Sequence, residues 1–427
     1  MSHNPAKLAY IASLIREAVD VNEVNEIWFS HLHEVRGTRL IYASAQPVGI
    51  VLPTSTWGMK SLTDAYPRCL YSTDNLYFMD DEIIRQYESL DKVPVSADVS
   101  IMLDSNVAGE IKRFVMNANP SNPDSLVVMD FLAGENNNFS YHQYALENAR
   151  NYFMKQGHAS YVRETLFYIK WFDYLDNYKS NKSKEPSIDK FSLWKEADTE
   201  LFKLYGTARR RESIKGYLRM HYLIYLVLLK IVEIEFAPVK KHFDKKLEML
   251  LDFMHEELHR IFLRELLLAV RYFKKRSEVS FMSKINKGCR SPLERLSNIA
   301  WDMMLFRVME KFATVKTSVG FFVPYFISFD EATRELFDTY RLKGLIAYGP
   351  EGKFVSIQQS DYTKVVLDAV EDSVTRGKLS RYFEQNAIEA RDQLVSRRLD
   401  SPSRQFVRQL EQKVWRECLN SPEASIS

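Results

Sequence analysis

Residues 97–106 read ADVSIMLDSN, an apolar run that ends on an acid, a hydroxyl and an amide. The run from 97 to 103 is short enough to be a buried strand. A helix is expected over 107–118, and Ser105 and Asn106 can cap its start. Ligands collect at the carboxyl ends of parallel strands in open α/β sheets. This stretch therefore predicts an α/β fold with Asp104 at a ligand-binding edge of the sheet.

A second stretch of this kind occurs far along the chain. Residues 321–330 read FFVPYFISFD, which is an apolar strand candidate that ends on Asp330. A helix over 331–341 and a short strand over 344–348 are expected to follow. If the two acid-ended strands are neighbours in one sheet, Asp104 and Asp330 converge at the same edge.

The rest of the chain is predicted to be mostly helical. Residues 38–52 look strand-like, whereas 177–190 read as an exposed linker. Capping-box patterns mark two helix starts, one at Ser140 with Gln143 and one at Ser291 with Glu294. Helices are expected over 122–134, 140–157, 191–278 and 291–313, and from 361 onward.

Composition sets the broad class of protein. The 427 residues exceed one ordinary core, so two or three packed units are expected. A net charge of +2 neither favours nor excludes nucleic acid. The three cysteines form no CxxC pair, which favours a reduced, cytoplasmic setting. The N-terminus lacks a signal-peptide pattern, and the apolar stretch 221–229 is about half the ~20 residues that span a bilayer, so no membrane partner is expected.

Residues 255–259 read HEELH, the pattern that zinc peptidases present on a helix. His255 and His259 would share one helix face, and Glu256 would polarise a zinc-bound water. Glu257 places a charge in the spacer, however, and the apolar face of this helix leaves both histidines on its flank. The third ligand stays open between Glu265 and Glu278. Two flanking histidines on a packed helix are the favoured interpretation.

Four other acids are scattered through the chain. Asp104 and Asp330 end strands, Glu147 lies within a predicted helix, and Asp302 lies in the apolar stretch NIAWDMMLFR. Carboxylates brought together repel one another and hold protons unless a cation relieves them. Such oxygen ligands suit Mg²⁺ or Mn²⁺, which can activate water and stabilise a phosphate under attack. Phosphodiester hydrolysis is the chemistry that fits.

Each acid also has a purely structural interpretation. Asp104 and Asp330 can be helix caps. Glu147 can be a solvent-facing helical acid, with Glu110, Asp130 or Glu135 in its place at the site. Asp302 lies between Trp301 and Met303, and an acid in apolar surroundings usually has a partner.

The order of these acids resembles that in PIN-domain nucleases. The segments that carry the resemblance are MLDSN (102–106), YALEN (144–148), NIAWDMMLFR (298–307) and FISFD (326–330). The family typically has Asp-Thr-Asn after its first strand, a helical Glu, a later helical Asp, and Thr-x-Asp after a strand. This chain has serine for threonine at Ser105 and Ser328, and more than 100 residues separate Glu147 from Asp302.

The resemblance implies both a fold and a site. The fold would be a Rossmann-type α/β/α core with a large helical insertion and a helical C-terminal extension. Asp104, Glu147, Asp302 and Asp330 would hold the metal and carry catalysis, and Asn106 and Ser328 would support them. The segments would be an N-terminal α/β part, two core parts separated by the insertion, and the extension, at 1–95, 96–156, 157–290, 291–350 and 351–427.

The resemblance also implies a substrate, because PIN-like enzymes mostly cut RNA and often act as toxins or defence components. RNA is therefore favoured over DNA. The cluster Arg209, Arg210, Arg211 and Lys215 is a candidate phosphate-binding patch, although acids accompany most basic residues here. The insertion would hold substrate, another copy of the chain or a regulatory protein. A rival interpretation is a helical scaffold protein with a degenerate, metal-free core.

Overall fold

A computed structural model describes residues 3–46, 50–51, 58–87, 95–134, 138–239, 241–317, 320–397, 402 and 404–419. The chain forms two compact units. Unit 1 comprises residues 1–215 and 305–359, and unit 2 comprises 216–304 and 360–427. The divisions after residues 215 and 304 fall inside the long helices α12 (Ala208–Phe236) and α16 (Pro292–Ala313). The predicted insertion, 157–290, thus contributes helices to both units.

Unit 1 contains a five-stranded antiparallel sheet in the order β2-β4-β1-β8-β9. Helix α1 (Pro5–Glu17) packs against β8 and β9 and buries one apolar face that includes Leu8, Ile11 and Ile15. The sheet joins the N-terminal segment to residues near 350. Its strands are β1 (Arg39–Ala43), β2 (Ile50–Val51), β4 (Asn75–Asp80), β8 (Leu342–Tyr348) and β9 (Lys353–Gln358).

The second sheet of unit 1 has the order β3-β7-β5-β6. Strand β5 (Ser96–Leu103) lies parallel to β7 (Gly320–Ile327) over its whole length and parallel to β6 (Phe139–Ser140). Strand β3 (Arg68–Cys69) pairs antiparallel with β7. Because β5 and β7 are parallel neighbours and Leu103 lies opposite Ile327, both strands end at the same edge.

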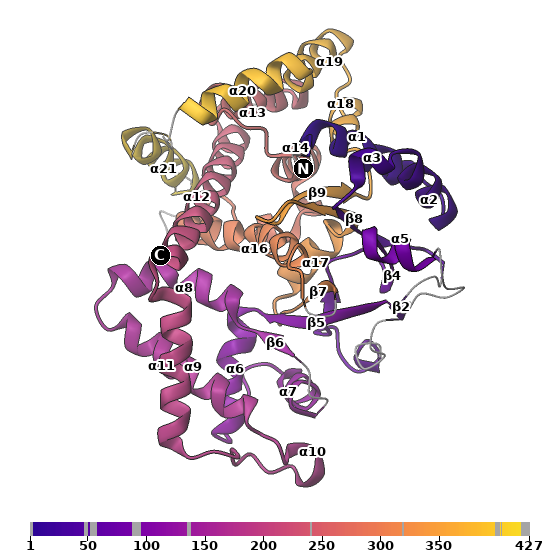
Figure 1. The fold of residues 1–427 in the computed structure, drawn as a ribbon. Helices are drawn as coiled ribbons and strands as arrows, with labels where there is room; N and C mark the ends of the chain where they lie inside the picture. The colour runs from indigo at the N-terminus through magenta and orange to yellow at the C-terminus, as the bar shows by residue number, and fades with distance from the viewer. Residues whose placement is uncertain are drawn as a thin grey trace. The chain divides into compact units, whose positions relative to one another are not determined.

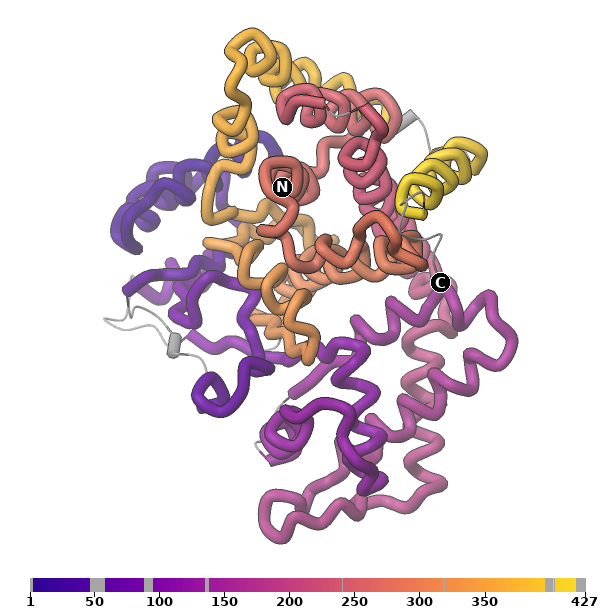
Figure 2. The backbone as a smooth tube through the Cα atoms, turned by 180° about the vertical axis from the view of Figure 1, so that it is seen from behind, coloured from indigo at the N-terminus to yellow at the C-terminus, as the bar shows by residue number. Residues whose placement is uncertain are grey.

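Helices of unit 1 gather beside this second sheet, in the magenta region of Figures 1 and 2. Helix α9 packs against α6, α8 and α11, and both α6 and α8 contact β5. The unit-1 helices other than α1, α12 and α16 have the bounds α2 (Val21–Ser30), α3 (Leu32–Val35), α5 (Asp81–Tyr87), α6 (Ser105–Val115), α7 (Ser125–Gly134), α8 (His142–Met154), α9 (His158–Asp173), α10 (Tyr178–Asn181), α11 (Lys190–Tyr205) and α17 (Glu331–Thr339).

Aromatic stacking fixes α16 and α17 against β7 within unit 1. The Phe337 ring of α17 stacks on Phe326 of β7 at 5.6 Å and on Phe306 of α16 at 5.3 Å. Phe306 also meets Tyr340 edge to face at 5.8 Å. Rings packed in this way hold the end of β7 and the start of α17 in one rigid arrangement.

Unit 2 is helical throughout the residues that the structure describes. Its central element is α12, in which residues 223–229 are buried, as expected for an apolar stretch too short to span a bilayer. Helix α14 packs against α13 and α18, and α13 also meets α19. The elements are α13 (Phe243–Glu256), α14 (Leu263–Lys274), α15 (Ser280–Ser283), α18 (Tyr362–Asp368), α19 (Ser373–Ser380), α20 (Gln385–Arg397) and α21 (Arg404–Leu419), with single 3-10 turns at Arg276–Glu278 and Arg381–Phe383.

The α/β class is confirmed, as are the strands predicted from residues 97, 321 and 344. Within the described part of the chain, no helix is both long enough and apolar enough to cross a membrane. The capping box at Ser140 was wrong. Ser140 belongs to strand β6, and helix α8 begins at His142 with no side-chain cap. The backbone of Ser140 is extended because β6 pairs with β5, so this residue belongs to the sheet rather than to helix α8.

We expect the β5–β7 pair to carry much of the stability of unit 1. Ile327 is fully buried at the end of β7, so Ile327→Ala should lower the free energy of unfolding by about 2–5 kcal/mol in urea titrations. Leu62→Ala is a matched control, because that side chain is 68% exposed and should change stability by less than about 0.5 kcal/mol. Equal effects of the two substitutions would contradict the assignment of β7 to the core.

Candidate active site

Asp104 is the centre of a buried hydrogen-bond network where β5 and β7 end. Its side chain is only 8% exposed. One carboxylate oxygen accepts the Ser105 backbone N–H at 2.7 Å. The other accepts the Asn106 amide at 2.8 Å and the Ser328 hydroxyl at 2.5 Å. The network joins positions that are 224 residues apart in the chain.

Ser328 and Asn106 hold the two strand ends together. The Asn106 amide also donates to the Ser328 hydroxyl at 3.3 Å, and its carbonyl oxygen accepts the Phe329 backbone N–H at 3.2 Å. The Ser328 hydroxyl in turn accepts the Asp330 backbone N–H at 3.0 Å. These contacts give Asn106 and Ser328 the supporting position that the sequence predicted for them.

Glu147 reaches the same place from helix α8. The Ser105 hydroxyl donates to one Glu147 oxygen, and the Gln143 amide donates to the other at 2.8 Å. Gln143 and Glu147 are one helical turn apart, so both side chains leave α8 on the same face. Ser105 therefore links the two acids, since its backbone N–H binds Asp104 while its hydroxyl binds Glu147.

Burial raises the pKa of both acids, and repulsion from a neighbouring carboxylate adds to each rise. Burial raises the pKa of Asp104, hydrogen bonds from Ser328 and Ser105 offset part of that rise, and the charge of Asp330 adds to it. Burial is also the main reason why the pKa of Glu147 rises to about 8, and the Asp104 charge raises it further. Close carboxyl groups away from water do not both ionise near neutral pH unless a cation joins them.

Asp104 and Asp330 both precede helices, but they cap them differently. Asp330 accepts the Ala332 and Thr333 backbone N–H groups at 2.8 and 3.4 Å, the usual pattern of an N-cap. Asp104 accepts only the Ser105 N–H from α6, and its other oxygen turns to Asn106 and Ser328. Capping accounts for Asp330, whereas the position of Asp104 depends on the neighbouring strand.

The oxygen atoms around Asp104 and Glu147 suit a hard cation in type. Gln143 is 1% exposed, and its amide oxygen is buried without a hydrogen-bond partner beside Glu147. A buried polar atom without a partner often marks the place of a water or an ion. Across the described residues, however, no three His, Cys, Asp or Glu side chains are grouped to hold a metal ion together. The donors present are two carboxyl groups and one amide oxygen.

Asp302 lies on α16 in the part of that helix that belongs to unit 2. Its side chain is half-buried and makes an interaction. Its contribution to the site with Asp104 stays a prediction.

The other acids considered for the place of Glu147 have different partners. Glu110 is buried and accepts the Ser125 hydroxyl at 2.8 Å. Asp130 binds the Tyr178 hydroxyl and pairs with a lysine, and Glu135 lies outside the described residues. Glu147 is the one whose pKa responds to the charge of Asp104.

The HEELH segment is not one helical face, which corrects the expectation of a helix through both histidines. Helix α13 ends at Glu256, and His259 has a positive φ of 51°. The His259 ring lies 3.1 Å from the backbone oxygen of His255. His255 contacts Arg391 at 3.3 Å and packs against the Tyr382 ring. The i,i+4 geometry of a zinc-peptidase helix is absent at these residues.

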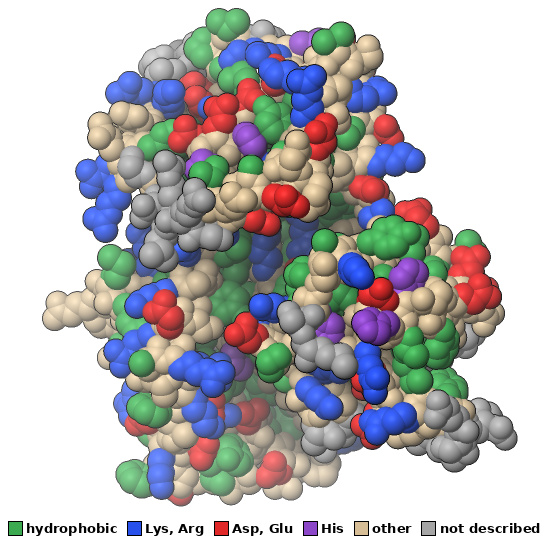
Figure 3. Space-filling model, turned by 45° about the horizontal axis from the view of Figure 1, so that its top comes forward, with side chains coloured by type: hydrophobic (Ala, Val, Ile, Leu, Met, Phe, Trp, Pro, Cys, Tyr) green, Lys and Arg blue, Asp and Glu red, His purple; other side chains and the backbone are tan. Residues whose placement is uncertain are grey.

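The predicted basic patch is exposed at the start of α12. Arg211 donates to the Gly206 carbonyl at 2.9 Å, and Lys215 pairs with Glu212 at 3.0 Å. Arg209 is exposed beside them. Burial lowers the pKa of His142 and the positive charge of Arg210 lowers it further, so that arginine lies within electrostatic reach of α8. On the face in Figure 3, basic and acidic side chains are interspersed, which matches the small net charge.

Two parts of the site were not predicted from sequence. The sequence pattern predicts a capping-box role for Gln143, although its i,i+4 spacing from Glu147 is a signal for a side-chain pair. For Ser105 the sequence predicts a helix cap or a replacement of threonine, and its bridge to Glu147 depends on where α8 packs. No family model, curated protein or solved structure matches this chain.

The raised pKa of Glu147 predicts how stability depends on pH. In the folded protein the Glu147 carboxyl keeps its proton up to about pH 8. In the unfolded chain the same carboxyl releases its proton near its ordinary pKa of about 4.3. The free energy of unfolding should therefore fall as pH rises between these values. Glu147→Gln removes this titration, and the loss of stability from pH 6 to pH 8 should shrink by roughly 2 kcal/mol.

Urea titrations at pH 6, 7 and 8 measure this effect in the absence of divalent cations. Glu212→Gln is the control, because Glu212 is an exposed acid on α12 that pairs with Lys215. A pH dependence in Glu147→Gln equal to that of the wild type would contradict the raised pKa of Glu147.

Proposed function

We propose that this protein is a metal-dependent nuclease of the PIN-like type that hydrolyses phosphodiester bonds. The observation that supports the proposal is the meeting of the Asp104 and Glu147 carboxyl groups, joined by Ser105, where two parallel strands end. Carboxyl groups whose pKa is raised because no positive charge lies beside them are suited to binding a divalent cation. The proposed PIN-like core comprises the parallel strands β5, β6 and β7 with α6, α8 and α16.

The residues of the chain would divide the work as follows. Asp104 and Glu147 would bind Mg²⁺ or Mn²⁺, and Asn106 and Ser328 would fix the orientation of Asp104. When bound, the cation would supply an activated water and neutralise charge on the phosphate. Glu147, whose pKa of about 8 belongs to the cation-free site, would release its proton when the cation binds. Asp330 and Asp302 would complete the acidic set.

RNA is the proposed substrate, because the resemblance to PIN-like enzymes favours it over DNA. The exposed cluster Arg209–Arg211 with Lys215 offers cations to a phosphate backbone. Arg210 is the member of that cluster whose charge acts on His142 of α8, the helix that also carries Glu147. A role as a cytoplasmic toxin or defence component belongs to the same proposal.

A second candidate function is an interaction or scaffold protein with a metal-free core. One observation favours it: within the described residues no three potential ligands are grouped for a metal ion. In that case the network around Asp104 would serve only to join β5 to β7. Cation binding separates the two candidates, because only the nuclease needs it.

Cation binding should be detectable without any substrate. Millimolar Mn²⁺ or Mg²⁺ should raise the Tm of the wild type at pH 8 by several degrees, because a ligand that binds only the folded state stabilises it. Asp104→Asn and Glu147→Gln should each abolish the rise while Glu212→Gln keeps it. No shift in the wild type, with no binding in isothermal titration calorimetry, would favour the scaffold candidate.

Cleavage should depend on the same acids. With Mn²⁺ and single-stranded RNA, Asp104→Asn and Asp302→Asn should lower the rate at least about 100-fold, since each amide removes a charge with little change in volume. Glu256→Gln in the HEELH segment is the matched control and should cleave like the wild type. Full activity of Asp302→Asn with loss in Asp104→Asn would exclude Asp302 alone from the site.

A further inference from the structure

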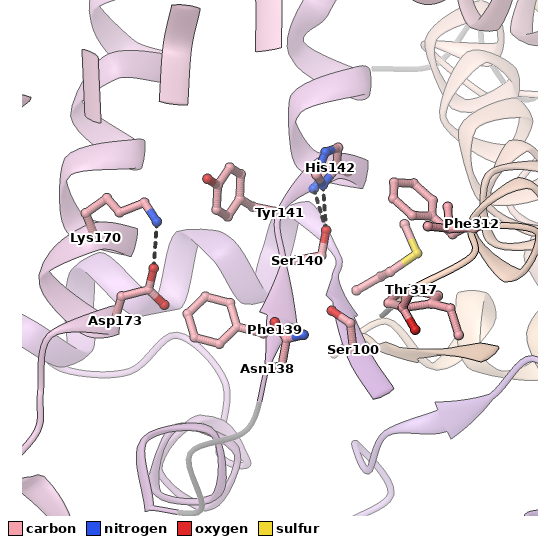
Figure 4. Close-up of a pocket in the computed structure, with 13 residues that line it drawn as sticks. Ser100, Asn138, Phe139, Ser140, Tyr141, His142, Lys170, Asp173, Phe312 and Thr317 are labelled. Carbon is pink, nitrogen blue, oxygen red and sulfur yellow. Dashed lines mark hydrogen bonds and ion pairs between the residues drawn. The ribbon is translucent and has the colours of Figure 1, made fainter. Parts of the chain in front are cut away.

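A pocket of about 440 Å³ opens in unit 1 on the sheet that carries Asp104 (Figure 4). Strand β6 forms its middle, Lys170 and Asp173 of α9 lie on one side, and Phe312 of α16 lies on the other. Its volume is in the range of small-molecule sites. The proposed nuclease chemistry leaves this pocket without a role.

Aromatic rings form much of the wall. Phe139, Phe312 and Phe322 line the pocket and are each half-buried, so each ring keeps apolar surface that another flat group can cover. Phe312 meets Phe322 at 6.4 Å and the His142 ring edge to face at 5.1 Å. Rings in this arrangement favour a planar aromatic ligand, because they offer both faces and edges for contact.

Hydrogen-bonding groups lie among these rings. The Ser140 hydroxyl and His142 Nδ1 are 2.7 Å apart, which leaves His142 Nε2 as the ring nitrogen for a ligand. The amide of Asn138 and the buried hydroxyl of Ser100 also line the pocket. The Lys170–Asp173 pair, at 2.8 Å, adds a charged donor and acceptor. Apolar walls with a few polar groups are typical of sites that orient a heteroaromatic ring.

The position of the pocket relates it to the candidate active site. Alternate residues of a strand share one face, so Ser100 and Met102 in the pocket lie on the same face of β5 as Asp104. Met102 is thus two residues, or about 7 Å, before Asp104 along the strand.

We propose that this pocket binds one nucleobase of a single-stranded nucleic acid and so positions the backbone beside Asp104. The inference deepens the proposed function and rests on it for the role of the bound strand. Base binding itself requires no cleavage. The base would stack on Phe312 beside Phe322, and the polar groups would meet its edge.

The test measures binding without metal, so that cleavage cannot interfere. A fluorescent eight-nucleotide RNA is titrated with the full chain in EDTA, followed by anisotropy. Phe312→Leu and Phe322→Leu keep apolar volume but remove a ring, and each should weaken binding by about 5-fold or more. Phe191→Leu, which removes an exposed ring on α11, should not change the affinity.

Competitors separate recognition of bases from recognition of phosphates. A mononucleotide should displace the RNA, whereas polyphosphate of equal charge should displace it only weakly at 0.15 M salt. Displacement by polyphosphate alone, or wild-type affinity in the double variant Phe312→Leu/Phe322→Leu, would overturn the proposal.

Crosslinking in the wild-type protein avoids any variant that fails to fold. RNA with 5-bromouridine is irradiated on the protein, and the attached peptide is identified by mass spectrometry. Attachment at residues 138–142 or at Phe312 supports the pocket, and attachment only elsewhere overturns it. A strand that crosslinks here but is never cut with Mn²⁺ would refute the nuclease and leave base binding intact, whereas cutting without attachment here would do the reverse.

Discussion

The parallel pairing of β5 with β7 is the constraint on which the candidate site depends. Leu103 and Ile327 lie opposite each other, and the Asp104 backbone N–H binds the Ile327 carbonyl at 3.1 Å. This register places Ser328 directly beside Asp104. A slip of β7 by one residue would turn Ser328 to the other face of the sheet, away from Asp104. The aromatic stack of Phe326, Phe337 and Phe306 resists such a slip, because it fixes one face of β7.

Around this pairing the protein retains acids in a place that does not favour their charged forms. A half-buried glutamate next to a buried aspartate costs folding free energy, because no basic side chain in the network neutralises either charge. The hydrogen bonds from Ser105, Asn106 and Ser328 hold the acids in place without supplying a positive charge. Arrangements of this type are more often found where a protein binds or transforms something than where it only needs to fold.

Much of this arrangement could be predicted from local sequence. The strands that end at Leu103 and Ile327 were visible because short apolar runs stop at acids. The neighbour relation of β5 and β7 was stated only as a condition, because strand order depends on packing across more than 200 residues. Strands β3, β4, β6 and β9 were not predicted. Strands β3 and β6 have only two residues each, so pairing within the sheet rather than residue propensity makes them strands. The end of α13 before His259 was hidden by an apolar pattern that continues past the helix.

The separation of Asp104 from Ser328 has a consequence for how the protein is made. Residues are joined from the N-terminus at about 5–20 per second, so the segment with Asp104 leaves the ribosome well before β7 exists. Until then, the oxygen that later accepts the Ser328 hydroxyl has only the local donor Asn106. A partly synthesised chain therefore has the acids but lacks the neighbour that aligns them. Any chemistry that depends on that alignment can begin only after β7 has been synthesised.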